Sequence, residues 1–342
     1  MNKLTISLSP HVHSGDSVKS NMFGVCIALV PAMICSFVFF GLGAIAVTAV
    51  SVASCVFFEW AIGKYMLKNA KPTVTDGSAI LTGMLLAFNM PSNIPLWIVV
   101  IGALFAIGVV KMTFGGLGCN LFNPALAGRA FLLISFPVQM TSWPVVGQGF
   151  TTIDGTTGAT PLALMKAAIK AKDASMLQDL PSAWDMLIGN TSSSVFGEGA
   201  MGGGCIGEVC ALAIIIGLIY MLARKIITWH IPVAIFATVA VFSGLLHLAN
   251  PIYAGPVEQL LSGGLMLGAV FMATDYVTSP MSKKGQLIYG VAIGFLTVVI
   301  RTWGAYPEGM SFAILIMNAF TPLINKAFKP YRFGVVKPSK KQ

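Results

Sequence analysis

The polar stretch TTIDGTTGATPLAL at residues 151–164 holds the side chains best suited to chemistry in an otherwise apolar chain. Part of it fits the pattern D-x-x-[ST]-G-A-T, for which a chance match has a probability of roughly one in a thousand. The members named from this motif are Asp154, Thr157, Gly158, Ala159 and Thr160. Pro161 and good helix formers follow, so Thr160 is predicted to cap a helix whose N-terminus favours an anion. The alternative is a glycine turn before a capped helix, with nothing attached.

The elements that must position this motif lie in a membrane, because the composition is that of a polytopic membrane protein. The 342 residues are 56% hydrophobic and 10% charged, and the mean hydropathy is +0.82. Soluble domains carry about a quarter charged residues. The basic residues behind the net charge of +9 are scattered, which argues against nucleic acid as a partner. Residues 1–20 lack an apolar core, so we expect no cleavable signal peptide.

Apolar runs of about 20 residues cross the hydrocarbon core. Ten such runs predict an all-α protein, at 22–41, 43–62, 78–90, 95–112, 120–137, 206–223, 228–248, 257–274, 286–302 and 309–325. The third run is cut short by Asn89, Met90 and Pro91, which predicts a broken half-membrane helix. LTGMLLA at 81–87 resembles SGGLMLGA at 262–269, in the third span of the second half. Five spans on each side of a long loop therefore predict two inverted repeats with broken half-helices.

The distribution of Lys and Arg orients the chain. Sixteen of them fall on the side of both termini and four on the other, while Arg129 lies inside a span. Because cytoplasmic loops collect basic residues, both termini are predicted to be cytoplasmic and the long loop external, or periplasmic. The predicted organisation is a cytoplasmic tail 1–20, a first five-helix repeat 21–137, the external loop 138–205, a second repeat 206–325 and a basic cytoplasmic tail 326–342.

Charged residues in or beside the spans are further candidates. Arg129 lies well inside a predicted span, shortly after Asn123 and Pro124. A buried charge costs several kcal/mol unless it is paired, so Arg129 is either a functional group or a structural pair. Asp76 and Asp275 lie at the predicted cytoplasmic ends of the third and eighth spans. They either line an ion path or cap and solvate the helix ends.

Histidine and cysteine patterns add no further site. The four histidines lack ligand spacing, so no protein metal site is expected, and the six cysteines contain no C-x-x-C pair. Most of the cysteines are predicted to be small buried hydrophobic residues. Cys205 and Cys210 begin a predicted span, where the spacing leaves a disulfide open. No G-x-G-x-x-G follows a predicted strand, so no dinucleotide site is expected.

Three further stretches complete the pattern: TDGSAILTGMLLAFNMPSN (75–93), GGLGCNLFNPALAGRAFLL (115–133) and GGLMLGAVFMATDYVTSP (263–280). With the motif and the span count, they resemble the RnfD/NqrB family. It contains the membrane flavoprotein RnfD of Rnf ion-translocating electron-transport complexes and its relative NqrB of the sodium-pumping NADH:quinone reductase. Only about 20 residues precede the first span, which favours the Rnf branch. Tyr276 stands where proline is expected.

The resemblance implies a cofactor and its attachment point. A flavin transferase would attach FMN through its phosphate to the hydroxyl of Thr160, and Asp154 would assist that transfer. Asn123 and Arg129 become candidate flavin-binding residues, with Arg129 facing the ring or the phosphate. A second, non-covalent flavin such as riboflavin is also implied, without an assigned position.

The implied function is that of a membrane subunit that carries electrons and has no stand-alone catalysis or catalytic residues of its own. Its partners would be the other subunits of an Rnf-type complex in the bacterial inner (plasma) membrane. Such a complex couples ferredoxin:NAD+ oxidoreduction to Na+ or H+ translocation. A small-solute permease or channel with inverted repeats and no redox role also fits the spans. A bound flavin distinguishes the two hypotheses.

Overall fold

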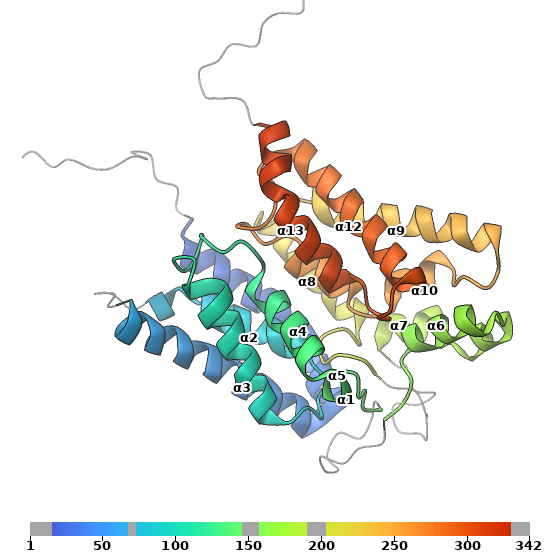
Figure 1. The fold of residues 1–342 in the computed structure, drawn as a ribbon, viewed down its shortest axis with the longest axis horizontal. Helices are drawn as coiled ribbons and strands as arrows, with labels where there is room; N and C mark the ends of the chain where they lie inside the picture. The colour runs from blue at the N-terminus through green and yellow to red at the C-terminus, as the bar shows by residue number, and fades with distance from the viewer. Residues whose placement is uncertain (1–15, 68–72, 146–156, 190–202, 330–342) are drawn as a thin grey trace, which may run out of the picture.

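The protein is built from α-helices, as the computed structural model in Figure 1 shows. The structure describes residues 16–67, 73–145, 157–189 and 203–329. Within these ranges there is no strand, only an isolated bridge between Pro144 and Thr157. The helical segments long and apolar enough to cross a membrane are Val18–Met66, His230–Ala249, Lys283–Trp303 and Met310–Ala327. The prediction of a helical membrane protein is confirmed at this level.

The first half of the chain forms five α-helices. They are α1 (Val18–Ala61), α2 (Ser78–Phe88), α3 (Leu96–Leu104), α4 (Pro124–Ser135) and α5 (Pro137–Met140), and π-helical turns extend α1 to Met66 and α3 to Met112. Inside α1, Gly41 has φ +57° and ψ −135°, which kinks the helix between the first two predicted spans. The two arms of α1 return to the same face of the molecule. Asn21 near its start and Lys111 line one cavity, and Lys111 pairs with Glu59 near its end.

The second half contains the other long helices. They are α8 (Ala211–Ala223), α9 (His230–Ala249), α10 (Pro256–Leu261), α11 (Leu265–Leu267), α12 (Lys283–Trp303) and α13 (Met310–Ala327), and a π-helical turn extends α11 to Met272. The predicted eighth span is interrupted between α10 and α11. Ser262 there has an extended backbone, and Gly263 has φ +66°, a conformation that favours glycine. The prediction that this span is broken is confirmed.

Two faces of the molecule can be distinguished in Figure 1. Between the halves lie α6 (Pro161–Ala171), a 3-10 turn (Ala174–Asp179) and α7 (Ala183–Ile188). In Figure 1, α6 and α7 lie beside α10, away from the start of α1 and the end of α13. We call the side of α6, α7, α10 and the α12–α13 turn the loop face. The side with the start of α1, the end of the α3 extension and the start of α12 is the basic face.

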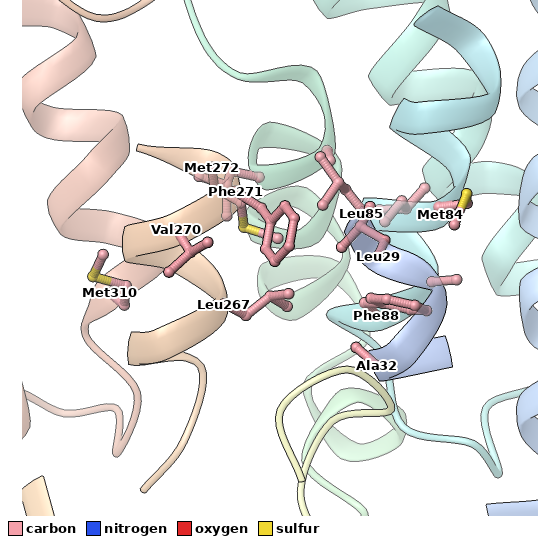
Figure 2. Close-up of a cluster of buried hydrophobic side chains, with 14 of the residues drawn as sticks. Leu29, Ala32, Met84, Leu85, Phe88, Leu267, Val270, Phe271, Met272 and Met310 are labelled. Atoms are coloured by element: carbon pink, nitrogen blue, oxygen red, sulfur yellow. The ribbon is translucent and has the colours of Figure 1, made fainter. Parts of the chain in front are cut away.

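The two interrupted helices enter from opposite faces and meet inside the molecule. α2 begins near the basic face and α11 near the loop face, and just beyond them Asn89 Nδ2 donates to Met272 Sδ at 3.6 Å. Figure 2 shows side chains of the α11 segment, including Phe271, facing Leu85 and Phe88 of α2 in one buried cluster. Packed protein therefore surrounds the broken backbone, as a membrane requires.

Small residues bring the two halves into close contact. α1 packs against α2, α3 and α8, while α9 packs against α12. A Cβ added to Gly217 of α8 would lie 2.5 Å from the Ala28 carbonyl oxygen of α1, so only glycine allows this crossing. Close backbone approach through glycine is typical of helix pairs in membranes, where dispersion contacts replace the hydrophobic effect.

Candidate functional site

Thr160 lies where the sequence predicts it, at the N-cap of α6. Its Oγ1 accepts a hydrogen bond from the Ala163 amide at 3.2 Å, and Pro161 occupies the first helical position. Of the rest of the motif, Thr157 and Ala159 are exposed, and the Gly158 amide donates to the Trp143 carbonyl at 3.1 Å. Asp154 lies outside the described residues. The helix that the motif precedes is therefore confirmed, together with its cap.

The surroundings of Thr160 fit a phosphate ester at its hydroxyl. Thr160 is only 7% exposed, but it lines a small hollow with Gly203, Gly204 and Gly263. The glycines leave space that side chains would fill, and the N-terminus of α6 favours negative charge. Glu208 also lines the hollow and is the group least suited to an anion. The finished fold thus covers most of Thr160, and the hollow provides the remaining access.

Near this hollow, charged side chains hold the start of α11. Arg301 Nη1 donates to the Gln259 carbonyl at 2.7 Å, and Nη2 donates to the Ser262 carbonyl at 3.0 Å. Arg301 also lies 3.5 Å from Glu308 Oε1. The other oxygen of Glu308 accepts the Gly264 amide at 2.8 Å. We call Gln259, Ser262, Arg301 and Glu308 the loop-face cluster, since together they satisfy the backbone at the break between α10 and α11.

A second charged cluster holds the start of α2 at the basic face. Lys111 Nζ donates to Glu59 Oε2 at 2.6 Å and to Ser78 Oγ at 2.7 Å. The Lys111 and Glu59 side chains are 2% and 1% exposed. Asp76 Oδ1 accepts the Ser78 amide at 2.8 Å and the Ser78 hydroxyl at 2.6 Å. These residues form the basic-face cluster, in which Asp76 caps α2, one of the two roles that its position allowed.

Arg129 lies between the two clusters and is paired within the protein. Its Nη1 donates to Asn89 Oδ1 at 3.2 Å and to the Ser311 hydroxyl. Its Nη2 donates to Cys205 Sγ at 3.6 Å. These partners come from the end of α2, the start of α13 and the segment before α8, so the guanidinium joins both halves. The structure therefore favours the structural alternative for Arg129 over a flavin contact.

The cysteines that leave a disulfide open in the sequence are free thiols. Cys205 is held by Arg129 and donates to the Asn89 carbonyl at 3.4 Å. Cys210 instead faces the Leu187 carbonyl of α7, at 3.8 Å. The two thiols therefore have different partners in the described structure.

Asn123 and Asp275 come together at a cavity on the basic face, between the halves. Asn123 caps α4 through the Ala125 amide at 3.1 Å, and its Nδ2 donates to the Met272 carbonyl at 3.3 Å. Asp275 accepts the Thr278 hydroxyl at 3.1 Å. Both residues line the cavity, together with Lys111, Asn120 and Phe271. Polar and aromatic side chains from both halves therefore surround this space.

Comparison with known proteins decides the family. Residues 5–334 match the NQR2, RnfD, RnfE family. The chain belongs to this family. It is 46% identical to the RnfD protein of the Na(+)-translocating ferredoxin:NAD(+) oxidoreductase complex of Acetobacterium woodii, covering 98% of this chain and 97% of that protein. It is 40% identical to the counterpart in the proton-translocating complex of Clostridium ljungdahlii, with 97% of each chain covered. The counterpart in an ion-translocating oxidoreductase complex of Stutzerimonas stutzeri is 38% identical, with 93% and 92% covered.

In this NQR2, RnfD, RnfE family member, the predicted site residues fall in different places. Thr160 lies at the loop face, Arg129 in the interior, and Asn123 and Asp275 at the basic-face cavity. Sequence reasoning treated Lys111 and Arg301 as loop charges and did not name Glu59 or Glu308. Their signal was a single charge in the last turns of an apolar run, a position that also suits a solvated helix end.

Proposed function

We propose that this chain is the electron-carrying membrane subunit of an ion-translocating ferredoxin:NAD+ oxidoreductase complex, with FMN attached through its phosphate to Thr160. Membership of the family over residues 5–334 supports the complex. So do relatives of matching length that are named as subunits of such complexes. The observation that carries the flavin is Thr160 itself, a capping hydroxyl at the N-terminus of α6 beside a glycine-lined hollow.

The residues of this chain hold and place the flavin. When bound, the flavin supplies the redox chemistry, and a covalent link prevents its loss by diffusion. The N-terminus of α6 stabilises the negative charge of a phosphodiester at the Thr160 hydroxyl. Pro161 at the first position of the helix has no amide hydrogen, so no amide donor is wasted there. The other subunits are the redox partners, and Na+ or H+ is the translocated ion.

The membrane arrangement that we propose has ten spans in two inverted five-helix repeats in the bacterial inner (plasma) membrane. The start of α2 at the basic face and of α11 at the loop face supports the inversion, as do Lys111 and Arg301 in the last turns of equivalent helices. The side with most Lys and Arg is then cytoplasmic and holds both termini, and the 138–205 loop is periplasmic. Thr160 accordingly faces the periplasm.

The basic-face cavity is the place that we propose for a second, non-covalent flavin such as riboflavin. Phe271 and other apolar walls suit a flat aromatic ring, and the amide side chains of Asn120 and Asn123 provide polar contacts at its edge. Riboflavin has no phosphate, and the cavity accordingly contains a carboxyl group, that of Asp275, as well as the ammonium of Lys111. Flavin released by denaturing the Thr160→Ala variant would identify this second molecule, because no covalent FMN could contribute to it.

The deciding experiment is intact-mass measurement after co-expression with a flavin transferase. We expect the mass of one FMN less water on the wild-type chain and none on Thr160→Ala. Thr157→Ala is the matched control, since it removes the exposed hydroxyl of the motif and leaves Thr160 in place. Flavin retained on Thr160→Ala would move the attachment point. An unmodified wild-type chain, with a transferase active on another substrate, would contradict the flavoprotein assignment and favour the permease.

A further inference from the structure

Lys166 of α6 is buried and makes contacts that its sequence position gave no reason to expect. Its Nζ donates to the Gly304 carbonyl and to the Tyr306 carbonyl, each at 2.6 Å. The residue is 9% exposed. Burial, and then the nearby Lys170, lower the pKa of this amine. A lysine in this place therefore gives up hydration of its charge for two directed contacts to the α12–α13 turn.

The rest of α6 fits the same surface closely. A Cβ on Gly263 would lie 2.2 Å from Leu162 Cδ1, so the absence of a side chain at Gly263 makes room for α6. Ser262 Oγ lies 4.0 Å from Met165 Sδ. Leu162 and Met165 also form a small buried cluster with Ala254. The helix that Thr160 caps is therefore seated on the break between α10 and α11.

The turn that Lys166 contacts also holds α11. Glu308 belongs to this turn and accepts the Gly264 amide, while Arg301 at the end of α12 binds the Ser262 carbonyl. The Gly304 and Tyr306 carbonyls that receive Lys166 lie between these two charged residues in the chain. The position of α6 is thus fixed to the same short segment that fixes the start of α11.

From these contacts we infer that Lys166 is a positioning residue for the flavin site. It holds Thr160, and whatever is attached there, at one place over the start of α11, so the carrier is a docked group and not a swinging arm. This inference rests on the proposed attachment of FMN at Thr160. Electron transfer to fixed neighbours requires a fixed distance, and supporting contacts around an attachment point provide it.

The test compares Lys166→Met with Lys170→Met in the full chain. Lys170 lies one turn later on α6 and is exposed, so its variant removes the same charge without the two carbonyl contacts. Intact mass gives the FMN content of each protein. Hydrogen exchange across 161–171 reports docking of α6, and the decay of flavin fluorescence anisotropy reports motion of the attached ring.

We expect FMN on all variants. Lys166→Met alone should exchange faster across α6 and show a larger amplitude of flavin motion, and Lys166→Arg should restore wild-type behaviour. Equal exchange and equal flavin motion in the Lys166→Met and Lys170→Met proteins would overturn the inference. Absence of FMN from the wild-type chain would instead defeat the proposed function, while the exchange data still decide whether Lys166 docks α6. If Lys166→Met does not accumulate, Lys166→Gln replaces it as the neutral variant.

Discussion

The two charged clusters hold the two interrupted helices by different kinds of partner. In the basic-face cluster, Lys111 bonds to side chains, the Glu59 carboxylate and the Ser78 hydroxyl. In the loop-face cluster, Arg301 bonds mainly to backbone carbonyls, those of Gln259 and Ser262. Both cations lie in the last turns of an apolar helix, yet one closes an ion pair and the other repairs a broken backbone.

The difference follows from what precedes each short helix. α2 comes after a 3-10 turn, and its first amide is satisfied locally by Asp76. α11 comes directly after α10, so the break leaves carbonyls of one helix and amides of the next without helical partners. Arg301 donates to the carbonyls, and Glu308 accepts the Gly264 amide. A guanidinium suits this role because it presents several donors in a fixed plane.

The largest effect is expected from Lys111→Met, which breaks the basic-face cluster. The Glu59 carboxylate is 1% exposed and would lose the ammonium that faces it. Removing one partner of a buried pair costs about 3 to 5 kcal/mol of folding free energy. Reversible denaturation in detergent, compared with the wild type, measures this loss.

The control for Lys111→Met is the double variant Lys111→Met with Glu59→Gln. Replacing both charges removes the stranded carboxylate, so most of the lost stability should return. A double variant as unstable as the sum of the two single ones would contradict a pairwise role for these residues. The charges would then act through other groups of the basic-face cluster.

Arg301→Met should have the next largest effect, at the loop face. Hydrogen bonds to a charged group contribute about 1.5 to 3 kcal/mol, and here the remaining partners are dipoles and one carboxylate. Hydrogen exchange should rise at the break between α10 and α11, around Ser262, while α2 stays protected. Arg301→Lys should not restore protection, because a single ammonium lacks the fork that reaches both carbonyls. Restoration by lysine would show that charge alone suffices there.

Glycines before the two short helices sharpen the same comparison. Gly77 has φ +83° and Gly263 has φ +66°, so alanine is strained at both positions. A Cβ at Gly77 would lie 3.1 Å from the Phe23 ring, whereas at Gly263 it would lie 2.2 Å from Leu162. We expect Gly77→Ala to cost about 1 kcal/mol. Gly263→Ala should cost about 2 kcal/mol, because overpacking is added to strain. Equal melting temperatures for the two variants would contradict close seating of α6 on Gly263.

Much of this architecture could be predicted from the sequence, because periodic and local signals determine it. Apolar runs located the long helices, Pro91 signalled the end of the first short one, and Thr160 with Pro161 marked the start of α6. The kink at Gly41 was predicted only as a gap between spans. Backbone geometry of this kind depends on where α1 must turn back, which no local pattern records.

The charge pairing could not be predicted, because the partners lie far apart in the chain. Lys111 meets Glu59 and Ser78, and Arg301 meets carbonyls 39 and 42 residues away. A carbonyl acceptor leaves no trace in the sequence, since every residue has one. The partners of Arg129 were open for the same reason. Attachment of FMN stays a prediction, since it depends on chemistry at Thr160 that the fold permits but does not perform.

The smallest effect is expected from Asp76, and it decides between the two roles that its position allowed. Asp76→Ala should cost about 1 kcal/mol, as the loss of a capping side chain does. Asp76→Asn keeps an oxygen that can accept the Ser78 amide and should retain that stability without the charge. If Asp76 only caps α2, vesicles containing the complex should translocate ions normally with Asp76→Asn. Lost translocation at unchanged stability would place the carboxylate on the ion path, and the basic-face cluster would then differ from the loop-face cluster in function as well as in its partners.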